Sequence, residues 1–380
     1  MTRGPIWDVA IAGGGPAGSV TALVLARAGW RVLVADASDG SPRAGEALPP
    51  AARPLLRDLQ LLPSVVAGGH LPSIGNASAW GSDELQISDF MFNVYGNGLH
   101  LERPVFDASL RSAAAAAGAT IAAGARVVGP HPIRLRIGRY EEPLTCRWLV
   151  DASGRAATSA RARGARRSVD DALVAFHARL VAGPDSTDSD SRTVIESCPD
   201  GWWYTVLLPS RERVVAFLTD RDLVSRKALL GAGGLMARIA QTRHIREIIR
   251  SGGYVMSGRA RGVDAAGGRL DLFGGDDWLA VGDAALSFDP LSSQGIFNAV
   301  YTGMQAGRAL NAALTGDGDG IRRYGVELEA IHRAYRRNLA AFYAHETRWP
   351  RHPFWRRRQG DSATNGEMEG IGGSGPAATR

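Results

Sequence analysis

The feature that most restricts the fold is the run Gly-Gly-Gly-Pro-Ala-Gly at residues 13–18. An apolar segment before it, residues 7–12, has the pattern of a buried strand, and residues 16–29 after it have the pattern of a helix that starts with small residues. A second apolar strand over residues 31–35 leads into Asp36. This β-α-β unit is the setting in which a glycine turn binds a dinucleotide.

Each glycine of the turn has a physical task in that setting. Gly13 allows the tight turn after the strand, Gly15 lets the backbone approach a pyrophosphate, and Gly18 lets the helix pack closely on the strand. The free N–H groups and the positive dipole end of the helix then face the phosphates. Asp36 can accept hydrogen bonds from ribose hydroxyls, which argues against NADP at this site. The turn alone does not separate FAD from NAD.

Two later segments favour FAD. Asp-Ala-Ser-Gly-Arg at residues 151–155 directly follows a predicted strand, and Gly282-Asp283 follows another. Gly282 permits close backbone approach, and the Asp283 carboxylate can bind ribitol hydroxyls. Residues 289–296 then turn into a predicted helix, whose N-terminal dipole would stabilise an anionic reduced flavin.

Composition excludes several other classes of protein. The 380-residue chain has a formal net charge of +6, but its arginines are scattered and no nucleic-acid-binding module accompanies them. Its two cysteines lack metal or redox spacing, so no disulfide framework or metal site is expected. No stretch approaches the roughly 20 apolar residues of a membrane span, and no secretory pattern is visible. We therefore expect a cytoplasmic protein.

The three motifs, in this order, resemble the p-hydroxybenzoate hydroxylase-type class of FAD proteins. That class includes aromatic hydroxylases, flavin-dependent halogenases and geranylgeranyl reductases, and the resemblance extends over residues 6–357. It implies an α/β (α+β) fold, in which a Rossmann-like FAD-binding domain is interrupted by an antiparallel β-sheet substrate domain and followed by C-terminal helices. The expected boundaries are 1–165 and 261–320 for the FAD-binding domain, 166–260 for the substrate domain, 321–358 for a C-terminal helical segment and 359–380 for a disordered tail.

Hydrophobic periodicity places further elements within these boundaries. Strands are predicted at 120–128, 173–181, 193–196, 202–208 and 213–218, and helices at 106–117, 227–250, 295–315 and 321–345. Within 227–250, the glycine-rich residues 231–234 are expected to form a loop or a helix start. Residues 62–102 have weak periodicity and are rich in Gly, Asn and Ser, so we expect loops and short strands over the cofactor.

A narrower resemblance rests on residues 45–50, 78–84, 201–204 and 289–295. Together these segments resemble the flavoproteins that mature tryptophylquinone enzymes such as lysine ε-oxidase, glycine oxidase and quinohemoprotein amine dehydrogenase. The resemblance implies hydroxylation of a tryptophan in a precursor protein. It also implies that O2 is consumed and that NAD(P)H or reduced flavin supplies electrons transiently. The substrate is then an aromatic small molecule or a precursor protein.

Halogenation is the nearest alternative reaction. Flavin-dependent halogenases use a lysine in the early part of the chain, whereas the only lysine here is Lys227. Hydroxylation of an electron-rich indole needs no strong base, because the cofactor carries the difficult chemistry. Two further alternatives stay open: an FAD-dependent C=C reductase similar to geranylgeranyl reductase, and a precursor-binding maturation factor in which FAD is structural.

Glu46, Trp202 and Tyr204 are the candidate catalytic residues. Glu46 follows the first β-α-β unit, where this class approaches the flavin, and strand alternation puts Trp202 and Tyr204 on one face and Trp203 on the other. The candidate cofactor-binding residues are Gly13, Gly15, Pro16, Ala17, Gly18, Asp36, Arg43, Glu46, Arg103, Val127, Gly154, Gly282, Asp283, Pro290, Gln294, Gly295 and Ile296.

Overall fold

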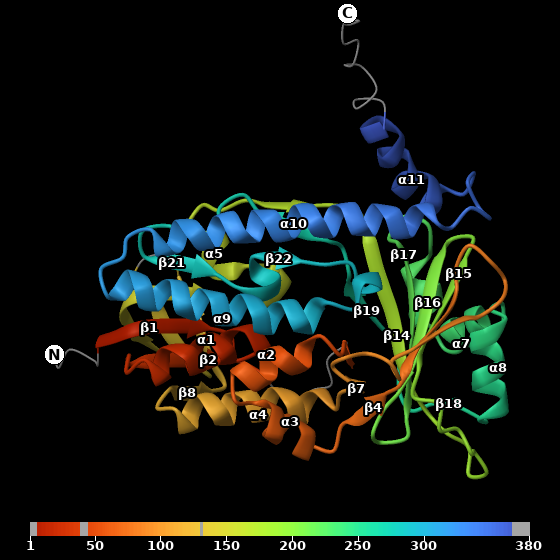
Figure 1. The fold of residues 1–380 in the computed structure, drawn as a ribbon, viewed down its shortest axis with the longest axis horizontal. Coiled ribbons are helices and arrows are strands. Elements are labelled where there is room, and N and C mark those ends of the chain that lie inside the picture. The colour runs from red at the N-terminus through yellow and green to blue at the C-terminus, as the bar shows by residue number, and fades with distance from the viewer. Residues whose placement is uncertain (1–5, 39–44, 130–131, 367–380) are drawn as a thin grey trace, which may run out of the picture.

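The computed structural model describes residues 6–38, 45–129 and 132–366. A parallel sheet and a larger, mainly antiparallel sheet lie on opposite sides of the folded structure (Figure 1). Helix α9 (Gly295–Leu314) packs beside the first sheet, and α10 (Gly320–Ala344) extends from the first sheet to the second. The predicted mixed α/β architecture with C-terminal helices is confirmed.

The parallel sheet is the core of the dinucleotide-binding unit. Its order is β21-β12-β1-β2-β8, and every neighbouring pair is parallel. The strands are β1 (Ile6–Ala12), β2 (Val32–Asp36), β8 (Thr120–Ala123), β12 (Thr145–Asp151) and β21 (Trp278–Ala280). Strand β2 is buried along its whole length, as expected for a parallel sheet with both faces covered.

Small residues let helices α1 (Pro16–Arg27) and α9 approach closely. A Cβ on Gly303 would lie 2.5 Å from the backbone oxygen of Ala17, and one on Gly307 would lie 2.7 Å from Cβ of Val24. The hydroxyl of Thr21 also donates to the Gly303 carbonyl at 3.0 Å. The helix after the last motif is thereby fixed against the helix after the first motif.

The larger sheet has the order β18-β14-β17-β16-β15-β5-β6, with β19 also paired to β14. Its strands are β5 (Gly75–Ala79), β6 (Gln86–Asp89), β14 (Leu173–Val181), β15 (Thr193–Cys198), β16 (Gly201–Leu207), β17 (Arg213–Asp220), β18 (Val255–Met256) and β19 (Arg261–Asp264). Every pair is antiparallel except β5 with β15, which is parallel.

This pairing differs from two predictions. Residues 75–89 were expected over the cofactor and within the first domain, yet β5 and β6 extend the larger sheet. Strand β19 lies just beyond the predicted end of the substrate domain at residue 260. Both differences have the same physical cause. Strand β5 hydrogen bonds to β15 and β19 hydrogen bonds to β14, and each pair joins segments that are far apart in the chain.

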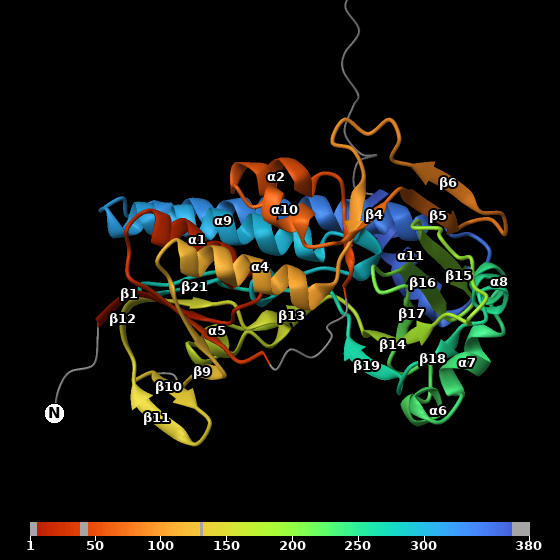
Figure 2. The same ribbon diagram turned by 90° about the horizontal axis from the view of Figure 1, so that it is seen from below.

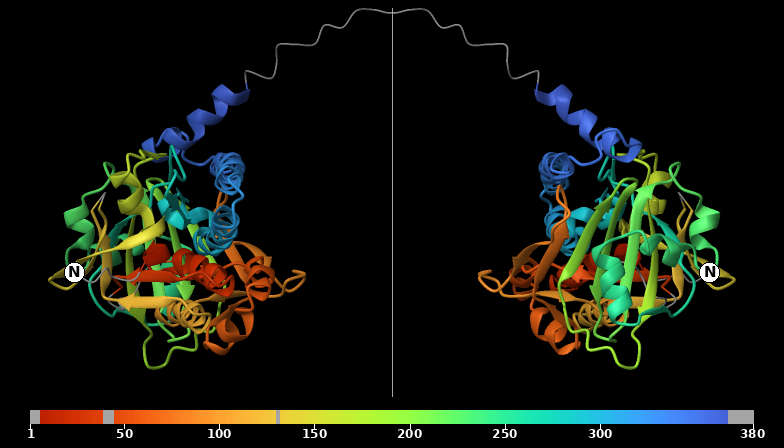
Figure 3. Two further views of the ribbon diagram at one scale, coloured as in Figure 1. Left: turned by 90° about the vertical axis from the view of Figure 1, so that its left-hand side faces the viewer. Right: turned by 90° about the vertical axis from the view of Figure 1, so that its right-hand side faces the viewer.

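Several predicted elements are divided in the structure. The strand predicted at 120–128 breaks at Gly124, whose φ of +70° ends β8, and β9 (Ala125–Val128) joins another sheet. The helical region predicted at 227–250 is three short helices, α6 (Arg226–Leu230), α7 (Gly234–Ile239) and α8 (His244–Ser251). The loop or helix start predicted at 231–234 agrees with the first break. Helices α7 and α8 lie against one face of the larger sheet (Figure 3), and their buried side chains share a hydrophobic cluster with β14 and β17.

The remaining helices include two that were not predicted in full. Residues 62–102 contain α3 (Leu62–Ala67), and α11 (Pro353–Gly366) extends beyond the predicted end of the helical segment at residue 358. The other helices are α2 (Ala52–Asp58), α4 (Arg103–Ala116), α5 (Thr158–Ala162), and the 3₁₀ turns η1 (Gly154–Ala156), η2 (Gly282–Ala284) and η3 (Pro290–Ser292). The rest of the predicted tail lies outside the described residues.

Three small sheets complete the fold of the residues that the structure describes. The first contains β9, β10 (Arg134–Ile137) and β11 (Tyr140–Pro143); the second contains β13 (Arg167–Val169), β20 (Gly268–Leu270) and β22 (Leu286–Ser287); the third contains β3 (Ala47–Leu48), β4 (Leu71–Ser73) and β7 (Gly98–His100). Among the described residues, no helix has the length and apolar character needed to cross a bilayer.

Candidate functional site

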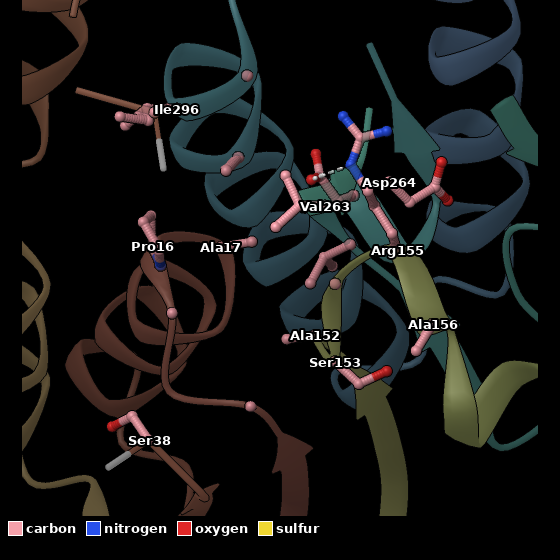
Figure 4. A pocket seen from close by; sticks show the side chains of 18 of the residues that line it. Pro16, Ala17, Ser38, Ala152, Ser153, Arg155, Ala156, Val263, Asp264 and Ile296 are labelled. Atoms are coloured by element: carbon pink, nitrogen blue, oxygen red, sulfur yellow. Dashed lines mark ion pairs between the residues drawn. The ribbon is translucent and has the colours of Figure 1, made fainter. Parts of the chain in front are cut away.

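A cavity of about 920 Å³ lies between the parallel sheet and the larger sheet. Its lining comes from the glycine turn, residues 152–156, the turn before α9, and strands β14, β15 and β16. Figure 4 shows Pro16 and Ala17 of the glycine turn facing Ser153 and Arg155 across the cavity. The predicted site residues that line it are Gly13, Gly15, Pro16, Ala17, Asp36, Glu46, Arg103, Val127, Gly154, Trp202, Tyr204, Asp283, Pro290, Gly295 and Ile296.

Four predicted site residues do not line the cavity or cannot be placed. Gly18 and Gly282 are buried beneath it, and Gln294 is exposed outside it. Arg43 lies outside the described residues. Gly282 acts through backbone geometry, because it has a φ of +56° and a Cβ there would lie 2.8 Å from Cβ of Ala17.

The glycine turn has no room for side chains at its two ends. Gly13 has a φ of +124°, and a Cβ on it would lie 2.3 Å from the Ala152 carbonyl oxygen. A Cβ on Gly18 would lie 2.0 Å from the Gly13 carbonyl oxygen. Gly15 is the N-cap of α1, and no side chain caps this helix end. The turn therefore presents uncapped backbone N–H groups beside the cavity, as phosphate binding requires.

Arg111 supports this turn from helix α4, and sequence reasoning missed it. Its Nη1 donates to the Gly14 carbonyl at 3.1 Å, and its Nε lies 3.3 Å from Oδ2 of Asp36. Asp36 also accepts from the backbone N–H of Ser38 at 3.1 Å and from its hydroxyl at 2.6 Å. No local motif signals this role, since Arg111 stands 75 residues after Asp36 in the chain.

A second acidic side chain, that of Asp283, also lines the cavity. The Asp283 side chain is 35% exposed, and its Oδ2 lies 3.5 Å from Nε of Arg155. Arg155 also donates to the Phe288 carbonyl at 2.9 Å, so it connects two of the predicted motifs (Figure 4). The sequence motif at residues 151–155 includes Arg155 but does not indicate its role, because only the folded chain brings it to Asp283.

The turn into α9 is held by Asp289, which is fully buried and lines the cavity. Its Oδ1 accepts from the Leu291 N–H at 2.9 Å, and its Oδ2 accepts from the Tyr343 hydroxyl at 2.7 Å. Ser293 follows with a φ of +50°, and α9 starts at Gly295 without a side-chain cap. A helix N-terminus with free N–H groups thus borders the cavity at Gly295 and Ile296.

Glu46, Trp202 and Tyr204 come together at the cavity wall. The Tyr204 hydroxyl donates to Oε2 of Glu46 at 3.5 Å, and Glu46 is only 3% exposed. Burial raises the pKa of Glu46, while the nearby charges of Arg103 and Arg179 offset part of that rise. Burial and the neighbouring Glu46 carboxylate raise the pKa of Tyr204 well above its usual value, so its hydroxyl stays protonated.

Strand alternation on β16 agrees with the prediction. Trp202 and Tyr204 line the cavity, whereas Trp203 stacks on Phe217 at a centroid distance of 4.7 Å on the other face. Among the described residues, none that lines the cavity is a lysine, and no group of His, Cys, Asp and Glu side chains could hold a metal ion. The helix that carries Lys227, α6, packs near β19 at the outer side of the larger sheet.

His100 lies behind this wall and is expected to make folding pH-dependent. Its ring is fully buried between the Leu207 carbonyl at 2.9 Å and the Thr193 hydroxyl at 3.1 Å. Burial lowers the pKa of His100 to about 4. The unfolded chain, with a histidine pKa of about 6.5, takes up a proton that the folded chain excludes, so stability falls as the pH drops from 7 towards 4.

Denaturant unfolding of wild type and His100→Gln at pH 7.5 and pH 5 measures this contribution. We expect the wild type to lose about 2 kcal/mol more stability than the variant over this interval. Equal pH dependence of the two proteins would contradict the buried neutral histidine.

Comparison with protein families matches residues 7–219 to the family described as FAD binding domain. LodB of Marinomonas mediterranea, which is named as an FAD-dependent oxidoreductase, is 31% identical over 372 residues, which are 94% of this chain and 98% of LodB. A flavin-dependent halogenase of Armillaria mellea is 27% identical over 342 residues, which are 81% of this chain and 66% of that halogenase.

A solved structure named as the peptidyl tryptophan dihydroxylase QhpG, essential for tryptophylquinone cofactor biogenesis, is 25% identical with a TM-score of 0.78. The match covers 93% of this chain and 79% of QhpG. The myxobacterial chondrochloren halogenase shares the fold with a TM-score of 0.83. The matched family binds FAD. Two features fit this dinucleotide: the turn at residues 13–18 leaves no room for a Cβ on Gly13 or Gly18, and the uncapped N-termini of α1 and α9 border the same cavity.

Proposed function

Because the chain belongs to the flavoprotein family defined by the FAD binding domain, we propose that it is a monooxygenase that hydroxylates the indole ring of a tryptophan in a precursor polypeptide. Its relatives are FAD-dependent oxidoreductases and halogenases, and the chain is itself an FAD-dependent oxidoreductase. The observation that carries the proposal is the buried Glu46–Tyr204 pair on an aromatic cavity wall that includes Trp202.

In this proposal the motif residues hold FAD along the cavity. The backbone of Gly13 and Gly15 and the N-terminus of α1 hold the pyrophosphate, Asp36 accepts from the ribose, and Asp283 accepts from the ribitol. Arg103 holds the Gly45 backbone with a 2.9 Å hydrogen bond to its carbonyl, directly before Glu46. When bound, FAD supplies the two-electron reduction of O2 and the transfer of one oxygen atom, with NAD(P)H or reduced flavin as the source of electrons.

In this proposal, residues of the chain orient the substrate ring and accept its proton. The ionised Glu46 carboxylate takes the proton from the ring carbon that has gained oxygen, which restores aromaticity. Burial raises the pKa of Glu46, which increases the affinity of its carboxylate for that proton. The protonated Tyr204 hydroxyl donates to Oε2 of Glu46 and fixes that oxygen, while Trp202 packs against the substrate ring.

An exposed apolar segment supports a polypeptide substrate. Between β6 and β7, Met91, Phe92 and Val94 are 76%, 91% and 88% exposed, and this connection projects from the surface beside β6 (Figure 2). Strand β7 pairs with β3, immediately after Glu46. Exposed apolar patches commonly mark protein–protein contact sites. We propose that the polypeptide carrying the target tryptophan binds this segment.

Halogenation is the second candidate, because halogenases are among the relatives and share the fold. The lining of the cavity, as far as the structure describes it, favours hydroxylation, since it lacks the lysine that halogenases use. A C=C reductase and a maturation factor with structural FAD have no specific observation in their favour.

One experiment separates these functions. FAD-loaded protein is mixed with NADH or chemically reduced FAD, isotopically labelled O2 and bromide. The substrate in one reaction is the precursor polypeptide of a tryptophylquinone-type oxidase encoded by a neighbouring gene, and in the other it is free tryptophan. We expect labelled oxygen on a tryptophan of the polypeptide, and Phe92→Asp to lower that rate about tenfold while leaving flavin reduction unchanged. Brominated product would establish halogenation, and consumption of reductant without any modified substrate would refute hydroxylation.

A further inference from the structure

Tyr343 joins the two sides of the cavity without lining it. It lies at the end of α10 and is 2% exposed. Its oxygen accepts a hydrogen bond from Nε1 of Trp202 at 3.2 Å, and its hydroxyl donates to Oδ2 of Asp289 at 2.7 Å. Trp202 belongs to the larger sheet and Asp289 to the turn before α9, and both line the cavity.

All the polar atoms in this chain of hydrogen bonds have partners. The other oxygen of Asp289 accepts from the Leu291 N–H, and the Asp289 N–H donates to the Tyr335 hydroxyl at 2.7 Å. Trp202 is 1% exposed and Asp289 is fully buried, so no water replaces a lost partner without a rearrangement. The position of Trp202 is therefore tied to the position of the turn.

The Tyr343 ring itself is fixed by packing. The rings of Trp80, Phe354 and Trp355 lie at centroid distances of 5.8, 6.1 and 6.0 Å, and the Arg358 guanidinium lies 5.2 Å from the ring centre. These contacts do not involve the hydroxyl. Removal of the hydroxyl alone thus leaves the ring held and breaks only the two hydrogen bonds to the cavity wall.

We propose that Tyr343 is a positioning residue that sets the substrate wall at Trp202 relative to the flavin-facing turn at Asp289. Without its hydroxyl, the indole N–H of Trp202 and the Asp289 carboxylate each lose a buried partner, and both groups shift to find another. The substrate ring then lies at a less favourable distance from the oxygen that is transferred. This positioning of the substrate rests on the proposed function, whereas the effect on the turn rests only on FAD binding.

The test compares Tyr343→Phe with Tyr324→Phe in the full-length, FAD-loaded protein. Tyr324 is a matched control, because it lies on the same helix, is 2% exposed and donates to the Ala280 carbonyl. We expect Tyr343→Phe to change the visible absorption and fluorescence of bound FAD, and Tyr324→Phe to leave both as in wild type. We also expect product formed per O2 consumed to fall about tenfold only in Tyr343→Phe, since misplaced reacting groups lose rate steeply.

The outcomes separate the two hypotheses. If the wild type modifies no aromatic substrate, the proposed function fails, and the flavin spectra still decide the positioning role. If the spectra of Tyr343→Phe match the wild type, or if Tyr324→Phe alters them equally, the positioning role of Tyr343 is wrong.

Discussion

Gly18→Ala is expected to raise the Kd for FAD about 100-fold, because overpacking at this position costs roughly 1–3 kcal/mol. The added Cβ would lie 2.0 Å from the Gly13 carbonyl oxygen and 3.0 Å from Cβ of Ala152. The turn has little room to move away, since a Cβ built on Gly13 itself would lie 2.3 Å from the Ala152 carbonyl oxygen. The turn must therefore open, and its N–H groups no longer converge on the phosphates.

Titration of FAD into apoprotein, followed by flavin fluorescence, measures this Kd. Gly325→Ala is the matched control, because Gly325 lies within α10 and nothing is within 4 Å of a Cβ built there. That variant should bind FAD normally and gain up to about 1 kcal/mol of stability from helix propensity. FAD binding by Gly18→Ala at the wild-type Kd would show that the turn does not carry the cofactor.

Glu46→Gln is expected to lower turnover about 10²- to 10⁴-fold, the usual contribution of a general base. Glutamine keeps the shape of the side chain but cannot take up the ring proton. Because burial disfavours the ionised carboxylate, we expect the melting temperature of the variant to equal or exceed that of wild type. Lower activity combined with unchanged or higher stability distinguishes a catalytic role from a structural one.

The pH profile gives a second check on Glu46. The wild-type rate should fall as the pH drops through the raised pKa of Glu46, because protonation removes the base. This acidic limb should be absent in Glu46→Gln. Glu102→Gln is the control, since Glu102 also lies near Arg179, at 3.3 Å, but does not line the cavity. Equal loss of rate in both variants would contradict proton transfer by Glu46.

Local patterns made much of the fold predictable. The glycine turn, the strands around it and β14 follow from short-range rules, because each depends on residues within one segment. The assignment of residues 75–89 failed because β5 owes its position to pairing with β15, which starts more than 110 residues later. Residues 231–234 separate α6 from α7, as the loop or helix start predicted there implies, and α7 begins at Gly234. The second break, between α7 and α8, was not predicted.

The candidate site was predictable to the same extent. The glycines whose backbone is predicted to contact the cofactor, and the acids Asp36 and Asp283, belong to motifs with fixed spacing. The sequence therefore predicts them as site residues. Arg111, Arg155 and Tyr343 contact residues from other segments, and nothing near them in the sequence indicates those contacts. The sequence predicts Glu46 and Tyr204 as separate site residues, and their hydrogen bond across 158 positions is visible only in the fold.

The parallel pairing of β5 with β15 has a consequence for building chimeras of these enzymes. A recombination site at residue 165 would leave the β5–β6 hairpin with the donor of the N-terminal half and its partner strand with the other parent. Such a hybrid sheet would join two strands that never evolved together. A unit that carries the whole larger sheet and its packing therefore has three separate pieces: residues 75–89, strands β14 to β19, and the C-terminal stretch that carries Tyr343 and Trp355.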